Sequence, residues 1–191
     1  MGRGAHLGCP VNVIRTAIPE VVVLEPRVFA DERGFFLESW NARYFRAAVG
    51  SDVAFVQDNH SRSRRGVLRG LHYQIVQPQG KLVRVVRGRA FDVAVDLRKS
   101  SATFGRWVGV ELSDDNHRQV FVPGGFAHGF LVLSDEADVL YKTTDYYAPQ
   151  HERCLIWNDP DVGIAWPLAG EPLLAAKDRA GLRLNEAETF T

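Results

Sequence analysis

Two stretches of the chain combine residue types that could carry out acid–base chemistry. The first, QDNHSRSRRGVLRGLHYQ at residues 57–74, mixes charged and amide side chains with apolar residues. Within it, Arg69 and His72 are flanked by glycine and apolar residues, so we interpret them as side chains that point into a cavity. The charged loop 62–65 is instead typical of a solvated surface. A histidine in such a cavity could accept a proton from a ligand.

The second stretch, PGGFAHGF at residues 123–130, places His128 just after a proline and glycine turn. The pattern PxGxxH between two strands matches the second conserved motif of cupin barrels, where the glycine permits a tight turn and the histidine points inward. A metal-binding cupin also carries an HxH pair and a later glutamate in its first motif. Here that motif reads LHYQ at residues 71–74, so His72 stands alone, and Lys81 follows it.

These departures argue against a bound metal. A protonated lysine has no free lone pair with which to bind a metal ion, and His72 and His128 alone make an incomplete set of ligands. The two cysteines, Cys9 and Cys154, have neither the CxxC spacing of a zinc site nor the number needed for a disulfide framework. We therefore predict a cupin without metal or other cofactor that uses acid–base chemistry.

Three tyrosines stand close together in VLYKTTDYYAP, residues 139–149. A phenol can donate a proton or offer a stacking surface in a cavity, but a tyrosine is also a common core residue with its hydroxyl bonded at the surface. The pattern leaves open which tyrosine serves which purpose. A fourth stretch, LAAKD at residues 174–178, is by itself typical of a surface segment or a helix end.

Short strands are expected to position these side chains. Alternating or β-branched runs occur at residues 21–24, 81–98, 107–112, 120–122, 129–133 and 139–144. The run 81–98 predicts two strands that meet near Gly88, and the apolar residues of the second share one face: Phe91, Val93, Val95 and Leu97. The close spacing of these runs predicts an all-β sandwich or barrel.

One early helix is predicted over residues 41–49, because Asn41 suits an N-cap and Gly50 stands just past its end. Short helical turns are expected in the tail, residues 171–191. We interpret residues 1–12 as an N-terminal extension and residues 13–191 as a single domain.

The composition narrows the classes of function. The 191 residues include 23 basic and 23 acidic side chains, and this zero net charge lacks the basic excess of a nucleic-acid binder. No apolar run approaches the ~20 residues that cross a bilayer, and the N-terminus lacks the apolar region of a signal peptide. We therefore expect a cytoplasmic protein that binds neither nucleic acid nor membrane.

Taken together, these segments resemble the dTDP-4-dehydrorhamnose 3,5-epimerase family of the cupin superfamily. The motifs cover nearly the whole chain after about Val13, in family order: DERGFFLESW (31–40), FVQDNHSRSRRGVLRGLHYQ (55–74), QGKLVRVVRG (79–88), FDVAVDLRKSSATFGRWVGVELS (91–113), VPGGFAHGFLVLS (122–134), LYKTTDYY (140–147), WNDPDVGIAWP (157–167) and AKD (176–178). The resemblance implies a mainly β fold, a cupin-type jelly-roll barrel with a few short helices. It also implies a homodimer that inverts C3 and C5 of dTDP-4-dehydro-6-deoxy-D-glucose to give dTDP-4-dehydro-L-rhamnose.

The family roles carry over to matching positions. The resemblance implies that His72 is the base and that Asp178 orients it. Lys81 is expected to stabilise an enolate, and Tyr141 to act as the acid on the opposite face. Further positions match residues that contact the substrate: Gln57, Asp58, Asn59, Arg69, His128, Tyr146, Glu152 and Lys177. Arg33 and Glu38 are expected to reach the nucleotide in the neighbouring subunit's site.

Three alternatives stay open at this point. A relative that epimerises only C3 or only C5 of the same substrate, in deoxysugar biosynthesis for a secondary metabolite, would share the same motifs. A metal-dependent cupin oxygenase or isomerase is disfavoured by the missing HxH pair and by Lys81. A sugar-binding cupin without enzyme activity would not need the full set of base, lysine and phenol.

Overall fold

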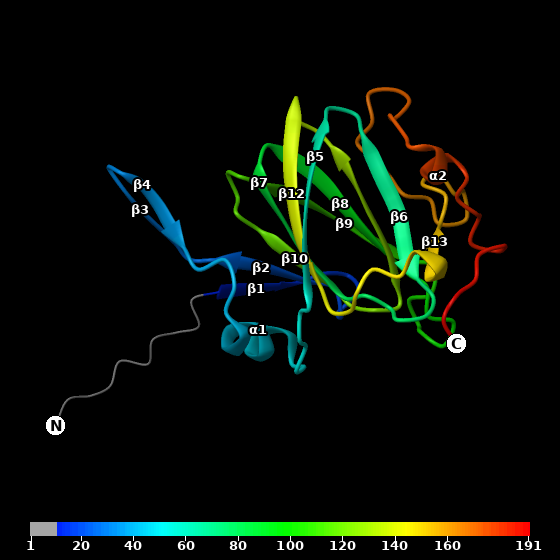
Figure 1. Ribbon diagram of the computed structural model, residues 1–191, viewed down its shortest axis with the longest axis horizontal. Coiled ribbons are helices and arrows are strands. Elements are labelled where there is room, and N and C mark those ends of the chain that lie inside the picture. Colours follow the sequence, from blue (N-terminus) through cyan, green and yellow to red (C-terminus); the bar gives the residue numbers. More distant parts are fainter. Residues whose placement is uncertain (1–10) are drawn as a thin grey trace.

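The computed structural model describes residues 11–191, which form two antiparallel sheets that face each other (Figure 1). One sheet has, in spatial order, β1 (Val11–Arg15), β2 (Val22–Pro26), β10 (Gln119–Val122), β7 (Lys81–Arg87), β12 (Glu136–Thr143) and β5 (Gln57–Arg64). The other has β13 (Glu152–Cys154), β6 (Leu68–Gln74), β11 (Phe126–Val132), β8 (Arg89–Asp96) and β9 (Trp107–Ser113). This arrangement confirms the predicted mainly β fold, a jelly-roll barrel of the cupin type.

The main core lies between the sheets, where apolar residues of both pack together. Val83 and Val85 of the first sheet meet Ala94 and Phe130 of the second. The predicted alternation along β8 is confirmed, but its apolar face points away from this core. Val93 packs instead into a second cluster, which the C-terminal segment covers with residues such as Phe190. Consequently, the more polar face of β8 is the one that points into the barrel.

Helix α1 (Ala42–Val49) agrees with the prediction at both ends. The side chain of Asn41 accepts hydrogen bonds from the backbone N–H groups of Arg43 and Tyr44, at 3.0 and 3.3 Å. Gly50 closes the helix in the left-handed conformation, with φ of 77°. The helix buries Phe45 against the outer face of the six-stranded sheet, where its ring packs on Phe121 of β10.

A hairpin of β3 (Val28–Asp31) and β4 (Gly34–Leu37) projects from the barrel (Figure 1). The predicted strand runs did not include it. Its phenylalanines are strongly exposed, with Phe35 at 61% and Phe36 at 68% of their full accessible surface. Such an apolar arm is typical of a surface that pairs with another chain.

The chain ends in irregular segments along the outside of the five-stranded sheet, with a 3₁₀-helix, η1 (Pro149–His151), and the predicted helical turn in the tail, α2 (Ala176–Arg179). The first strand begins at Val11, two residues before the predicted start of the domain, and the rest of the predicted extension lies outside the described residues. Among residues 11–191, no helix is long and apolar enough to cross a membrane.

Candidate active site

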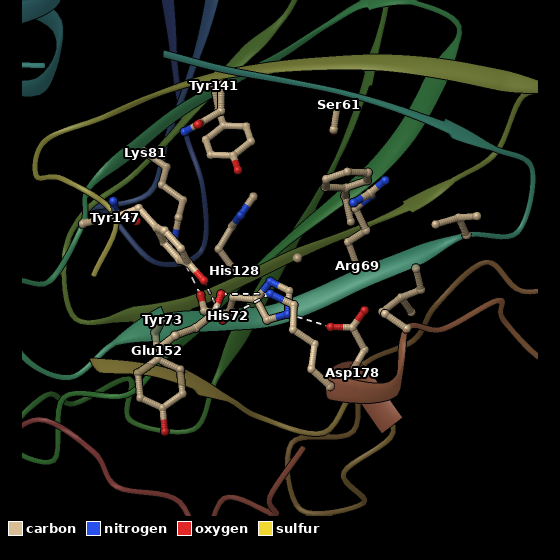
Figure 2. Close-up of a pocket in the computed structure, with 18 of the residues that line it drawn as sticks. Ser61, Arg69, His72, Tyr73, Lys81, His128, Tyr141, Tyr147, Glu152 and Asp178 are labelled. Carbon is tan, nitrogen blue, oxygen red and sulfur yellow. Dashed lines mark hydrogen bonds and ion pairs between the residues drawn. The ribbon is translucent and has the colours of Figure 1, made fainter. Parts of the chain in front are cut away.

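A cavity of about 550 Å³ opens between the two sheets (Figure 2). Strands β5, β7 and β12 line it from one sheet and β6, β11 and β13 from the other, while residues 173–178 close one side. Ten of the predicted site residues line it: Gln57, Asn59, Arg69, His72, Lys81, His128, Tyr141, Glu152, Lys177 and Asp178. Segments far apart in the sequence therefore meet in one site.

His72 and Asp178 form a close pair at the base of this cavity. The Nε2 atom of His72 lies 2.6 Å from Oδ1 of Asp178, which is almost fully buried. Burial would raise the pKa of Asp178, but the bond from His72 and backbone bonds from Gly70 and Ala175 lower it below its usual value. The carboxylate thus holds the ring by Nε2 and leaves Nδ1 as the nitrogen that can take a proton from a ligand.

A close approach of two strands sets the position of His72. Gly70 has φ of 123°, and a Cβ built on it would lie 2.6 Å from the Cα of Gly129 on β11. Only glycine allows this contact, which coincides with a shift in register between His128 and Phe130. Beyond the shift, His72 and His128 are paired across the two strands. Gly70 and Gly129, which lie next to the two histidines in the sequence, are therefore needed for the close approach of β6 and β11.

Lys81 is a buried cation on the opposite sheet. Burial lowers its pKa from 10.5 to about 8, while the carboxylates of Asp92 and Glu152 act in the other direction. Its Nζ lies 3.5 Å from the backbone carbonyl oxygen of His72, a weak contact. Because a pKa near 8 still leaves the ammonium group mostly charged at pH 7, the cavity holds a positive charge close to His72.

His128 forms a second buried pair with Asp92, and this pair was not predicted. Its Nε2 is 3.0 and 2.9 Å from the two carboxylate oxygens of Asp92, and both residues are buried. The sequence did contain a signal for Asp92, because it occupies the face of β8 opposite the apolar residues. Without a fold, that alternation could not tell whether the polar face pointed into the barrel or into solvent.

Of the three tyrosines at residues 139–149, two line the cavity. Tyr141 points its hydroxyl into the cavity from β12 (Figure 2), and burial raises its pKa, so that the phenol keeps its proton at neutral pH. Tyr147 lies nearer the opening, with its hydroxyl 3.2 Å from Oε2 of Glu152. Lys177 binds Oε1 of the same carboxylate at 3.0 Å. This charged cluster sits beside His72 and Lys81.

Four predicted site residues do not line the cavity: Asp58, Tyr146, Arg33 and Glu38. Asp58 points out of the barrel and pairs with Lys142, at 2.9 Å, because neighbouring residues of a strand face opposite sides. Tyr146 does not line the cavity and is 62% exposed. The strand has ended at Thr143, and in the following turn it is Tyr147 that turns inward, with its N–H bonded to Gln57.

Arg33 and Glu38 are far from the cavity within one chain. Arg33, at the tip of the β3–β4 hairpin, is strongly exposed and pairs with Asp31 at 2.6 Å. Glu38 accepts hydrogen bonds from Asn41 at the start of α1. Their predicted contact with a neighbouring subunit's site stays a prediction.

Ser61 is a lining residue that the motifs did not single out. Its hydroxyl oxygen is buried and has no hydrogen-bond partner among residues 11–191. It follows Gln57 and Asn59 on the inward face of β5, and those two share a hydrogen bond of 3.0 Å. A ligand could satisfy the orphan hydroxyl.

One group of potential metal ligands occurs within the described part of the chain. Atoms of His72, Cys154 and Asp178 lie within 4.8 Å of one another. This set differs from the expected cupin arrangement, since it lacks His128. Burial raises the pKa of the Cys154 thiol to about 12, so that the free thiol is a poor nucleophile at neutral pH.

Comparisons with known proteins agree with this geometry. A family model described as dTDP-4-dehydrorhamnose 3,5-epimerase matches residues 15–186. A protein of that name from Pseudomonas aeruginosa is 63% identical over 94% of this chain and 99% of its own length, and one from Shigella flexneri is 58% identical over 94% and 99%. The crystal structure of a dTDP-6-deoxy-D-glucose-3,5-epimerase from Legionella pneumophila, in complex with dTDP-4-keto-L-rhamnose, is similar with a TM-score of 0.91. It is 53% identical, covering 93% of this chain and 95% of that one.

The burial of the His128–Asp92 pair predicts a large effect on stability. Asp92→Ala is expected to lower the free energy of unfolding by about 2–3 kcal/mol, because it leaves buried His128 without its partner. The matched control, Asp58→Ala, breaks an exposed ion pair and should cost less than about 1 kcal/mol. Urea denaturation of both variants measures the difference. Equal effects would contradict the buried pair.

Proposed function

The chain belongs to the dTDP-4-dehydrorhamnose 3,5-epimerase family, and on this premise we propose its substrate and the roles of its residues. The protein is an isomerase that inverts C3 and C5 of dTDP-4-dehydro-6-deoxy-D-glucose. The product is dTDP-4-dehydro-L-rhamnose. The observation that carries this proposal is the meeting of His72, Lys81 and Tyr141 in one cavity, in a chain 63% identical to a relative of that name.

The reaction needs three groups, because C3 and C5 both flank the C4 ketone. A base removes a proton from one of these carbons and leaves an enolate. A cation or hydrogen-bond donor stabilises the charge that develops on the ketone oxygen. An acid then returns a proton to the other face of the carbon, since return to the same face would restore the original configuration.

His72 is the base in this proposal. Asp178 binds Nε2 at 2.6 Å and keeps that nitrogen protonated, so that Nδ1 carries the lone pair. When Nδ1 takes the substrate proton, the ring becomes a cation that the buried carboxylate stabilises. Lys81, a buried ammonium group close to His72, supplies the positive charge for the enolate.

Tyr141 is the acid. It comes from β12 on the six-stranded sheet, whereas His72 comes from β6 on the five-stranded sheet. Figure 2 shows the Tyr141 hydroxyl pointing across the cavity toward the side from which His72 projects. A sugar ring held between the two sheets would then meet the base on one face and the acid on the other. The raised pKa of Tyr141 keeps the phenol protonated until it is needed.

The polar rim would hold the rest of the nucleotide sugar. The planar fork of Arg69 suits a diphosphate, because it can donate two hydrogen bonds at once. On β5, Gln57, Asn59 and Ser61, whose hydroxyl has no partner among residues 11–191, offer further donors and acceptors. This mechanism uses no metal and no cofactor, because the side chains supply the base, the positive charge and the acid.

A homodimer would complete the site. The exposed phenylalanines of the β3–β4 hairpin suit contact with a second copy of the chain, and Arg33 at its tip could then reach a neighbouring cavity. Glu38 follows the same hairpin. A cytoplasmic location is part of the proposal, since nucleotide sugars are made and used there.

Reaction in deuterated water tests the proposed activity. The converted substrate should carry deuterium at both C3 and C5, because each inversion replaces a carbon-bound hydrogen with one from solvent-exchanged groups. Nuclear magnetic resonance of the product, trapped with a 4-ketoreductase, measures both positions. Deuterium at only one carbon would support the single-site epimerase instead, and no incorporation would contradict epimerisation.

Mixing two inactive variants tests whether Arg33 of one chain contributes to the active site of the other chain in a dimer. His72→Ala removes the base, and Arg33→Ala removes the group expected to reach the neighbour. In a mixed dimer, one cavity would have an intact His72 together with Arg33 of the other chain. Random exchange after mild unfolding and refolding should therefore restore about a quarter of wild-type activity.

The control for this exchange is each variant refolded alone. Activity of the mixture that does not exceed the average of the two separate variants would contradict the proposal that Arg33 acts across a dimer. Sedimentation of the refolded mixture establishes that dimers have formed.

A further inference from the structure

Cys154 lies directly opposite His72 on the neighbouring strand. The register of β13 with β6 pairs the two residues. The adjacent pair, Leu71 and Leu155, exchanges both backbone hydrogen bonds, at 3.2 and 2.9 Å. In an antiparallel ladder such pairs alternate with closer pairs that exchange none, so His72 and Cys154 form a narrow pair. Their side chains project from the same face of the sheet, and His72 lines the cavity.

Asp178 brings a third donor to the same place from α2. Its carboxylate is hydrogen-bonded to the imidazole. A ring nitrogen of His72, the sulfur of Cys154 and a carboxylate oxygen of Asp178 all lie within 4.8 Å of one another. The Cys154 sulfur makes only a weak bond, at 3.6 Å, to the carbonyl oxygen of Leu155. One nitrogen, one sulfur and one carboxylate oxygen therefore converge, and the proposed mechanism makes no use of the sulfur.

We propose that His72, Cys154 and Asp178 form an inhibitory site for a thiophilic divalent cation such as Zn²⁺. Zinc binds imidazole nitrogen and carboxylate oxygen at about 2.0–2.2 Å and thiolate sulfur at about 2.3 Å, in a tetrahedron whose fourth position can hold water. Neighbouring ligand atoms in such a tetrahedron are about 3.3–3.7 Å apart. The His72–Asp178 pair, now at 2.6 Å, would open by about 1 Å, and the sulfur would approach the ion to complete the set.

The inhibition follows from the chemistry of imidazole. Zinc at Nε2 displaces the proton from that nitrogen to solvent, and Nδ1 takes up a proton from solvent in its place. The ring stays neutral, and the nitrogen assigned as the base has no free lone pair. The ion also takes Asp178 away from its orienting role. On binding, the Cys154 thiol releases its proton to solvent and becomes a thiolate ligand. The inhibition rests on the proposed function of His72, whereas the binding of zinc does not.

This site differs from the metal site of a cupin barrel. The cupin motifs place a histidine pair, a glutamate and the histidine of PxGxxH around one ion, and here Lys81 interrupts that set. The proposed ligands share only His72 with it. Cys154 and Asp178 come from β13 and α2, beside the barrel motifs.

Cobalt provides a direct readout of binding. Chelator-treated protein is titrated with Co²⁺, which gives near-ultraviolet thiolate-to-metal absorption only when a cysteine sulfur is bound, and Zn²⁺ then displaces it. Wild type and the matched control Cys9→Ala should bind one ion per chain with this absorption. Cys154→Ala and Cys154→Ser should lack the absorption and bind Zn²⁺ at least about tenfold more weakly. Absorption that persists in Cys154→Ala, or is absent in wild type, would overturn the site.

Activity gives the second readout. The chelator-treated wild type and Cys154→Ala should both be fully active, since the cysteine has no role in the reaction. Added Zn²⁺ should inhibit wild type and Cys9→Ala, and at least about tenfold more Zn²⁺ should be needed to inhibit Cys154→Ala. Equal inhibition of all variants would overturn the proposal. If the chain lacked epimerase activity altogether, the cobalt absorption would still decide whether the site binds metal.

Discussion

The hydrogen bond between His72 and Asp178 joins parts of the chain that are 106 positions apart. The final third of the sequence makes this contact possible. Leu155 and Leu182 form a bridge, as do Val67 and Leu173, and these tie the irregular C-terminal segment to the sheet that carries His72. A change that loosened this segment would release Asp178, and the imidazole would lose the partner that fixes its tautomer. The C-terminal segment is therefore part of the site as well as a cover for the second core.

The two sheets divide the chemistry between them. The five-stranded sheet supplies both histidines, each held by a buried carboxylate, while the six-stranded sheet supplies Lys81 and Tyr141. The two sheets thus present different groups to the two faces of a ligand held between them. This suits the proposed reaction, in which one group removes a proton from one face and another group supplies a proton to the opposite face. The register of β13 with β6 also places Cys154 opposite His72, and this pairing underlies the proposed metal site.

Local pattern predicted much of the fold and part of the site. Asn41 and Gly50 marked both ends of α1, and strand runs were placed from alternation, but the pattern could not say which face of β8 points inward. Asp58 does not line the cavity because neighbouring residues of a strand face opposite sides, and after the strand ends it is Tyr147, not Tyr146, that lines it. The predicted substrate contacts of Asp58 and Tyr146 stay predictions. Asp178 lies in a segment with no local signal, and only the family resemblance identified it. Contacts between distant segments were the part that periodicity could not predict.

The central claim of the proposed mechanism is that His72 acts as the base and Tyr141 as the acid. The direct measurement compares two rates in Tyr141→Phe: exchange of the C3 and C5 hydrogens of the substrate with deuterated water, and inversion at those carbons. The account predicts that exchange continues, because His72 still removes the protons, while inversion falls by at least about a hundredfold for want of the acid. Inversion at the wild-type rate in Tyr141→Phe would contradict it.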